Sequence, residues 1–180
     1  MFSAAILNGG QATRFGGRDK SALLVDGRTI HDRQIAELSR VTDDVLVVTE
    51  DLVPGCGPLG GLHTALTNAR GHAVFVVACD MPFIDAPFVQ YLLDLTREAD
   101  AVVPRTERGY HPLCAAYTRS CLPAIGHRLA HRQLKMADLF ADVRTRVVTS
   151  DEIDRFGDRN RLLANVNTQA EYAGIQTHKP

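Results

Sequence analysis

The chain has 180 residues, and Lys and Arg total 20 against 21 for Asp and Glu, which leaves a net charge of -1. This near balance argues against a dedicated nucleic-acid binder, whose domain normally carries a strong basic excess. No apolar run approaches the ~20 residues that cross a bilayer, and the N-terminus does not have the pattern of a signal peptide. The length fits a single domain over residues 1–180.

The spacing of the cysteines matches no zinc or iron–sulfur template. They are Cys56, Cys79, Cys114 and Cys121. We therefore expect reduced cysteines that pack as small apolar residues in a cytoplasmic protein, with a structural disulfide as the less favoured alternative. The same composition leads us to expect no nucleic-acid partner and no membrane partner.

Short apolar runs alternate with helical patterns along the chain. The expected strands are Ser3–Leu7, Asp44–Thr49, Ala73–Cys79, Ala101–Val103, Leu113–Tyr117 and Arg144–Thr149. The expected helices are Ile30–Val41, Leu59–Asn68, Pro87–Glu98, Ser120–Leu129, Met136–Phe140 and Thr168–Ala173. Asp85 and Thr168 are placed to cap two of these helices. The Asp26-Gly27 pair predicts a hairpin between Ala22–Val25 and Thr29–Ile30.

Strands that alternate with helices predict an α/β fold with a largely parallel sheet. Ala73–Cys79 is almost continuously apolar, as expected of a strand that is covered on both faces. We expect a three-layer αβα sandwich in one domain, with a mostly parallel, mixed sheet.

The segment from Leu7 to Lys20 follows the first expected strand and contains four glycines. Glycines allow close backbone approach, and their N–H groups can hold an anion. Arg14 and Lys20 add charged donors suited to phosphate. The segment is not a Walker loop, because Asp19 precedes Lys20, and it is not the G-x-G-x-x-G of dinucleotide-binding folds. The alternative is a flexible surface loop with incidental charges.

Four segments together resemble the nucleotidyltransferases that share a glycosyltransferase-like fold. The first loop is similar to the family signature of Leu, paired glycines, an Arg, a further glycine and an Asp-Lys ending. Gly57–Leu62 resembles the family's second glycine loop, Val76–Pro82 its strand-Asp-x-Pro motif, and Asn165–Thr168 its N-x-N-T motif. The Gly-Gly pair and the Asp-Lys ending are most similar to the molybdenum cofactor guanylyltransferases of the MobA type, because cytidylyltransferase relatives typically have Ala-Gly.

The resemblance implies a Rossmann-like nucleotidyltransferase fold and a specific reaction. GMP would pass from GTP to the terminal phosphate of molybdopterin, with release of pyrophosphate and formation of molybdopterin guanine dinucleotide. Mg²⁺ would be the cofactor, and molybdenum-cofactor insertion or delivery proteins would be candidate partners. A phosphate nucleophile is already ionised at neutral pH, so no general base is required.

The resemblance also assigns a nucleotide site. The implied contacts are Leu7, Asn8, Gly9, Gly10, Arg14, Gly16, Lys20, Asp51 and Asp80. Leu7, Asn8 and Gly9 would meet guanine, and the rest of the loop would carry the phosphates. Arg14 and Lys20 would neutralise charge on those phosphates in the transition state. Asn8 stands where the family usually has Ala, so its side chain adds a hydrogen bond or crowds the base.

The segment between Thr49 and Gly57 consists only of Glu50–Cys56, whereas the resemblance implies an excursion of about twenty residues at this place. Asp51 lies where the family has a guanine-contacting Asp, and a carboxylate can accept from N1–H and the exocyclic amine of guanine. An ordinary loop acid is the alternative.

Asp80 follows a buried strand, and the resemblance makes it the Mg²⁺ ligand. A carboxylate at that position suits Mg²⁺, which binds through one or two carboxylates together with substrate phosphates. Asn167, or Asn165, would complete the metal environment. The alternatives are an Asp that caps the turn before Pro82, and asparagines that form a capping turn into Thr168.

The second substrate is implied to meet Arg105, His111 and Arg132. Arg132 belongs to a basic run that continues from His127 to Lys135 on an expected helix. The run has three interpretations: a solvated face, a patch that attracts the anionic pterin, or a zinc site built on His127 and His131.

Two other functions remain open. The first is another nucleotidyltransferase of the same fold, such as a cytidylyl- or sugar-phosphate nucleotidylyltransferase. The second is a non-catalytic protein that binds the nucleotide or the cofactor. The presence of Arg14, Lys20 and Asp80 together argues against the second, because a binding module does not need the whole set.

Overall fold

The computed structural model describes the backbone of residues 1–9, 14–15 and 18–166, and the side chains of 1–9 and 21–166. The main sheet consists of β1 Phe2–Leu7, β6 Val45–Val48, β7 Ala73–Ala78, β8 Ala101–Thr106, β9 Gly109–Tyr110, β10 Cys114–Thr118 and β11 Thr145–Val148. Two small hairpins pair β2 Arg14–Phe15 with β3 Arg18–Asp19, and β4 Leu24–Val25 with β5 Arg28–Thr29. The α-helices are α1 Ile30–Leu38, α2 Gly57–Asn68, α3 Ala86–Leu95, α4 Leu122–Ala130, α5 Ser150–Ile153 and α6 Arg159–Leu162.

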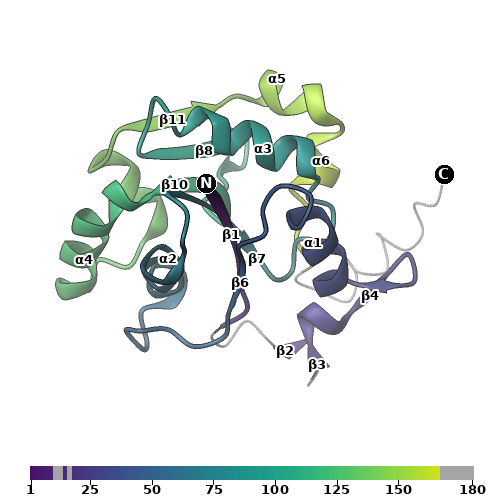
Figure 1. Cartoon of the computed structure of the whole chain (residues 1–180), viewed down its shortest axis with the longest axis horizontal. Helices are drawn as coiled ribbons and strands as arrows, with labels where there is room; N and C mark the ends of the chain where they lie inside the picture. Colours follow the sequence, from purple (N-terminus) through teal and green to yellow (C-terminus); the bar gives the residue numbers. More distant parts are fainter. Residues whose placement is uncertain (10–13, 16–17, 167–180) are drawn as a thin grey trace.

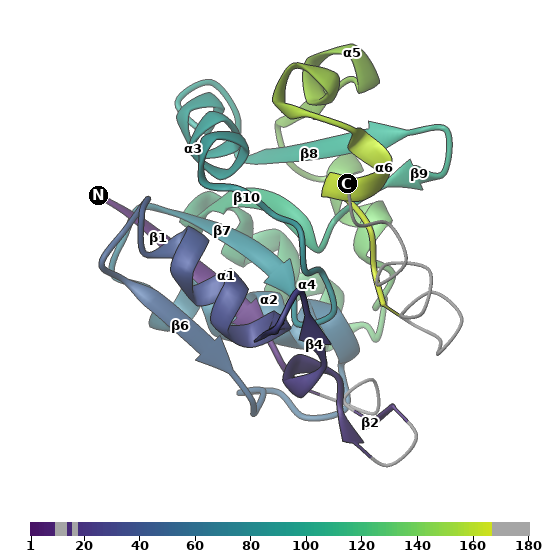
Figure 2. The same cartoon turned by 90° about the vertical axis from the view of Figure 1, so that its right-hand side faces the viewer.

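The sheet is mixed, with strand order β11-β8-β10-β7-β1-β6 and β9 paired to β8. β1 pairs in parallel with both β6 and β7, so Leu7 lies opposite Val48 and Ala78. The carboxyl ends of these three strands therefore meet at one edge of the sheet, which is where open α/β sheets bind ligands. Figure 2 shows the three strands running in the same direction, with β2 beyond their carboxyl ends. β10 runs antiparallel between β7 and β8.

Each face of the sheet has its own apolar core, which confirms the expected three layers. Along β1, Ala4 and Ile6 pack toward α1 and α3, and Ala5 packs toward α2 and α4. The alternation follows from the two-residue period of a strand, which sends successive side chains to opposite faces. Figure 1 shows α2 and α4 on one side of the sheet and α1 on the other. The strand Ala73–Ala78 is buried throughout, as expected for one covered on both faces.

Local turn and cap chemistry agrees with the sequence at two positions. Asp26 has φ 50° and Gly27 has φ 77°, and this left-handed pair turns β4 into β5. Asp85 caps α3 by accepting a hydrogen bond from the Phe88 N–H at 2.9 Å. The helix expected over Ile30–Val41 ends earlier, at Leu38. Beyond the helix end, the Thr42 hydroxyl donates to the carbonyl of Phe2 at the start of β1.

The elements not expected from the sequence are short. They include β9, α5 and α6, of which β9 depends on Gly109 at φ 103°. Met136–Phe140 forms a 3₁₀ helix that extends to Ala141. The helix expected over Thr168–Ala173 lies outside the described residues. All four cysteines are buried and form no disulfide with one another, as expected. Within the described part, no helix is long and apolar enough to cross a membrane.

Candidate active site

Asp80 lies in a tight turn directly after β7. The turn runs from Ala78 to Met81, whose N–H donates to the Ala78 carbonyl at 3.3 Å. The Cys79 N–H donates to the Leu7 carbonyl at 3.1 Å, which ties the turn to the end of β1. The side chain of Asp80 is only 8% exposed in the folded chain. The turn thus places a nearly buried carboxylate at the edge where β1, β6 and β7 end.

The segment after α6 returns to this carboxylate. The Asn165 side-chain amide donates to Asp80 Oδ1 at 3.2 Å, and the Val166 N–H donates to the Asp80 carbonyl at 2.9 Å. Asp80 and Asn165 together supply carboxylate and amide groups, whose oxygens are the hard ligands that Mg²⁺ prefers. The donor chemistry therefore fits the implied metal. Asn167 lies outside the described residues.

Asp51 lies in a space that glycines leave open. A Cβ atom built on Gly60 would lie 3.1 Å from Asp51 Oδ2, and one on Gly61 would lie 3.5 Å from Oδ1. A Cβ on Gly9 would lie 3.9 Å from the same Oδ1. Burial raises the pKa of the Asp51 carboxyl above its ordinary value of 3.8. The glycines of both glycine-rich segments therefore surround one partly desolvated carboxylate.

The second glycine-rich segment is helical rather than a loop. The sequence predicts a helix from Leu59, whereas α2 begins at Gly57, which has φ 56°. Thr64 on this helix accepts a hydrogen bond from the Leu52 N–H at 2.9 Å and so fixes the residue next to Asp51. Sequence reasoning missed Thr64, and its only signal is a polar residue on an otherwise apolar helix face.

Asn8 presents an acceptor close to this position. Its N–H donates to the Val48 carbonyl at 2.8 Å, which continues the β1–β6 ladder one residue beyond β1. The Asn8 Oδ1 atom is buried and has no hydrogen-bond partner in the described part of the protein. Leu7 packs against α2, because a Cβ on Gly61 would lie 3.1 Å from Leu7 Cδ1. Gly10 and Gly16 lie outside the described residues, and Arg14 and Lys20 are described only in their backbone.

A second wall of the candidate site, formed by residues 105–113, lies beside the end of β7. The Ala78 N–H donates to the Leu113 carbonyl at 3.0 Å, which joins the β9–β10 connection to the Asp80 turn. His111 Nε2 lies 2.9 Å from Thr106 Oγ1. Burial, with a smaller effect of Arg108, lowers the pKa of His111 below its ordinary value of 6.5, which favours the neutral ring. The Arg105 guanidinium lies 5.2 Å from the centre of the Tyr110 ring.

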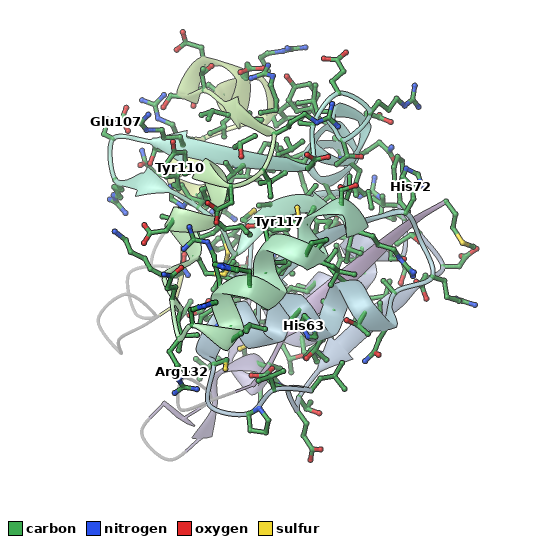
Figure 3. The ribbon with its side chains drawn as sticks, turned by 90° about the vertical axis from the view of Figure 1, so that its left-hand side faces the viewer. His63, His72, Glu107, Tyr110, Tyr117 and Arg132 are labelled. Atoms are coloured by element: carbon green, nitrogen blue, oxygen red, sulfur yellow. The ribbon has the colours of Figure 1, made fainter. Side chains whose placement is uncertain are left out.

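Arg132 reaches the beginning of α2 rather than this wall. Its Nη1 donates to Cys56 Sγ at 3.6 Å, and its own backbone has φ 56°. Figure 3 shows Arg132 and Tyr110 at the same end of the molecule, with His72 at the opposite end. Arg105, His111 and Arg132 therefore lie at the carboxyl edge of the sheet but on separate elements.

The basic run before Arg132 is not uniformly solvated. Arg128 is 9% exposed, pairs with Asp142 at 2.5 Å and donates to the Asp138 carbonyl at 2.6 Å. The rings of His127 and His131 lie 4.2 Å apart, and His131 Nδ1 is 2.8 Å from the His127 carbonyl. The described residues contain no group of three His, Cys, Asp or Glu side chains that could hold a metal.

A separate hollow lies on the α1 side of the Asp80 turn. It has a volume of about 360 Å³ and is bordered by α1, the Pro82–Asp85 segment and α6. Arg161 lies 4.1 Å from the centre of the Phe83 ring at this hollow. The described site residues expected from the sequence do not line it. The candidate site is therefore the sheet edge between Asp51 and Asp80.

Comparison with known proteins agrees with this architecture. Residues 4–145 match the family described as the MobA-like NTP transferase domain. A protein of Pelotomaculum thermopropionicum named "Probable molybdenum cofactor guanylyltransferase" is 33% identical, over 94% of this chain and 89% of its own length. A protein of Desulfosudis oleivorans named "Molybdenum cofactor guanylyltransferase" is 30% identical, over 92% and 90% respectively.

Solved structures share the fold at lower identity. The molybdopterin-guanine dinucleotide biosynthesis protein A of Archaeoglobus fulgidus superposes with a TM-score of 0.81 at 19% identity, over 98% of this chain and 97% of that one. The 2-C-methyl-D-erythritol 4-phosphate cytidylyltransferase of Thermus thermophilus superposes with a TM-score of 0.66 at 15% identity, over 96% of both chains. At these identities the likeness establishes the fold alone.

Proposed function

Because the chain belongs to the MobA-like NTP transferase family, we propose that it transfers GMP from GTP to the terminal phosphate of molybdopterin. The products are pyrophosphate and molybdopterin guanine dinucleotide. The relatives that are 33% and 30% identical carry the name of this activity. The whole chain, 1–180, acts as one nucleotidyltransferase domain in this proposal.

The observation that carries the choice of nucleotide is the position of Asp51. Its carboxylate lies among Gly9, Gly60 and Gly61 at the sheet edge that also holds Asp80. A carboxylate accepts two hydrogen bonds from guanine, one from N1–H and one from the exocyclic amine. Adenine and cytosine have an acceptor where guanine has N1–H, so they leave this desolvated carboxylate unpaired. Leu7, the last residue of β1, and Asn8, which follows it, would line the same place.

The reaction is an in-line displacement at the α-phosphorus. An oxygen of the molybdopterin phosphate forms the new P–O bond, and the bond to the β-phosphate oxygen breaks with pyrophosphate as the leaving group. Both reactants are anions, so positioning and charge stabilisation dominate the chemistry. Arg14 and Lys20 hold the triphosphate and offset its charge, with Gly10 and Gly16 giving it backbone room. Asp80, with Asn165 or Asn167, would hold Mg²⁺, which supplies further neutralisation of phosphate charge.

The sheet order places β7, which Asp80 follows, between β10 and the β1–β6 pair, so the acceptor would meet residues 105–113 on the opposite side of Asp80 from Asp51. The Leu113 carbonyl joins that side of the site to Ala78, so His111 is held near the turn. Burial lowers the pKa of His111, so the ring would offer the acceptor a hydrogen bond. Arg105 and Arg132 attract the anionic pterin in this proposal. Insertion or delivery proteins in the cytoplasm would then receive the product.

Pyrophosphate release by the purified protein tests the proposal. The assay contains Mg²⁺ and molybdenum-loaded molybdopterin, and it offers GTP, CTP, UTP and ATP separately. We expect release with GTP at a rate at least ten times that with the other nucleotides. Faster release with CTP would show that the enzyme prefers cytosine to guanine, and the proposed nucleotidyl transfer would stand. No release from the folded protein with any nucleotide would overturn catalysis in favour of binding alone.

A further inference from the structure

Gln34 of α1 lies under the Asp80 turn and holds both of its ends. The side chain is fully buried, with 0% exposure. Its Nε2 donates to the Ala78 carbonyl at 2.8 Å and to the Met81 carbonyl at 2.9 Å. These are the first and last residues of the turn that contains Asp80. One amide group therefore spans the turn from the side of α1.

Other contacts position the rest of the turn. The Cys79 N–H is bound to Leu7, and the Asp80 carbonyl is bound to Val166. Arg33, the neighbour of Gln34 on α1, donates through Nε to the Pro82 carbonyl at 3.1 Å. The carbonyls of residues 78, 81 and 82 thus all accept hydrogen bonds from α1. The Asp80 turn is fastened to a helix that contributes no group to the nucleotide site.

A glutamine amide is suited to donating hydrogen bonds to both the Ala78 and the Met81 carbonyl. Its Oε1 is buried and has no partner among the residues that the structure describes. A buried, unsatisfied oxygen costs stability, and an apolar side chain of the same size would fill the space without that cost. Among side chains that are uncharged at pH 7, only the amide of Asn or Gln presents two N–H donors from one atom. A glutamate would face two carbonyls with acceptors and add a negative charge near Asp80.

We propose that Gln34 is a positioning residue for Asp80. Its two hydrogen bonds keep the turn closed, and the closed turn gives the carboxylate one orientation toward the metal–triphosphate complex. The inference rests on the proposed nucleotidyl transfer, but it concerns the metal end of the site and not the base. Groups that orient a metal ligand from outside the coordination sphere typically contribute 10- to 100-fold to metal affinity.

The test is Gln34→Met, which keeps the length and packing of the side chain and removes both donors. Mn²⁺ replaces Mg²⁺ so that metal binding in the nucleotide complex can be titrated by electron paramagnetic resonance. We expect Mn²⁺ affinity to fall about 10-fold, with kcat falling at least as far. The Kd for nucleotide without metal should stay within twofold, because Asp51 and the first loop are unchanged. Gln34→Asn, which is too short to span the turn, should give the same pattern if the Met variant does not fold.

Ser3→Ala is the matched control. Ser3 is also fully buried, and its hydroxyl donates to Asp44 and accepts from the Gly71 N–H, at the amino end of β1. This variant should lose thermal stability and keep its Mn²⁺ affinity. Wild-type Mn²⁺ affinity in both Gln34 variants would overturn the inference, as would an equal loss of affinity in Ser3→Ala. The titration uses whichever nucleotide the wild-type protein turns over, so an error in the proposed base leaves this test intact.

Discussion

Asn165 donates a hydrogen bond to the Asp80 carboxylate at 3.2 Å, although the two residues are 85 positions apart in the chain. The bond joins the end of β7 to the segment that follows α6. It places a neutral donor against one carboxylate oxygen in a nearly buried position. The geometry at Asp80 therefore depends on the C-terminal part of the described chain as well as on the sheet.

Asp80→Ala should abolish turnover and leave the fold intact. The carboxylate is the expected metal ligand, and metal-ion stabilisation of a transition state is worth several kcal/mol, or about a thousandfold in rate. Pyrophosphate release measures the loss, and the circular dichroism spectrum reports the fold. Asp94→Ala removes an exposed carboxylate from α3 and should turn over normally. Turnover near the wild-type rate in folded Asp80→Ala would remove Asp80 from the mechanism.

Asn165→Ala should weaken metal binding with little effect on nucleotide affinity. The variant loses the donor at 3.2 Å from Asp80 Oδ1 and keeps Asp51 and its glycines. We expect the Mg²⁺ concentration needed for half-maximal activity to rise about 10-fold. Asn160→Ala, an exposed position on α6, is the control and should show no rise. An unchanged metal requirement in Asn165→Ala would limit the role of Asn165 to shaping the turn.

Asp51→Asn should reduce the preference for GTP. The amide replaces one acceptor by a donor that faces the donors of guanine, and hydrogen bonds to a charged group contribute about 1.5–3 kcal/mol, or roughly 10- to 100-fold in KM. Turnover at saturating GTP should change less than KM. Equal preference for GTP in variant and wild type would make Asp51 an ordinary loop acid.

Asp51→Asn should also change how the free energy of unfolding depends on pH. Burial raises the pKa of Asp51 above 3.8 in the folded state, so ionisation of this group destabilises the fold. That destabilisation is absent at pH values below 3.8 and grows as pH rises through the folded pKa. Asp51→Asn should therefore match or exceed the wild type in free energy of unfolding at pH 7, and the difference should shrink near pH 3 in denaturant titrations.

Lys20→Ala should lower turnover by orders of magnitude. The prediction comes from the first glycine-rich segment, in which the family resemblance assigns Lys20 and Arg14 to the phosphates. Charge-assisted bonds to phosphate are roughly twice as strong as neutral ones, and they strengthen as pyrophosphate leaves. Steady-state rates with GTP provide the measurement, and Lys135→Ala, an exposed lysine next to a 3₁₀ helix, is the control. An unchanged rate in Lys20→Ala would exclude Lys20 from catalysis.

Glu152 should make stability depend on pH in the acid range. Burial alone would raise its pKa, but hydrogen bonds from Arg146, Thr149 and Tyr91 outweigh burial and lower the pKa from 4.5 to about 2. The stabilisation is therefore complete above pH 4.5 and is lost as pH falls toward about 2. Glu152→Gln should cost about 2 kcal/mol at pH 7, and the cost should vanish near pH 2.

Chemical denaturation at several pH values measures this difference. Asp151→Asn changes an exposed carboxylate in the first turn of the same helix and should give a nearly pH-independent difference from wild type. A constant difference between Glu152→Gln and wild type from pH 7 to pH 2 would contradict the role of ionised Glu152.

Local patterns in the sequence were enough to predict most elements and to predict that Asp80 lies where β7 ends. The period of apolar residues identified β1, β7 and their neighbours, because a strand between two layers buries every side chain. The hairpin turn depends only on the neighbouring residues Asp26 and Gly27, which both adopt positive φ. The cap of α3 depends only on Asp85 and on the Phe88 N–H three residues later. An Asp at the end of a buried strand had to lie at the edge of the sheet.

Tertiary structure alone decided which distant groups meet. Nothing in the local pattern of α1 indicates that Gln34 reaches the carbonyls of Ala78 and Met81. In the same way, Arg128 belongs to a basic run by sequence, and only packing against the Asp138–Asp142 segment buries it. These contacts depend on the distances between layers, and those distances are set by the volumes of side chains from many parts of the chain. Periodicity reports which face of an element is buried, whereas packing determines the partner that each polar group finds there.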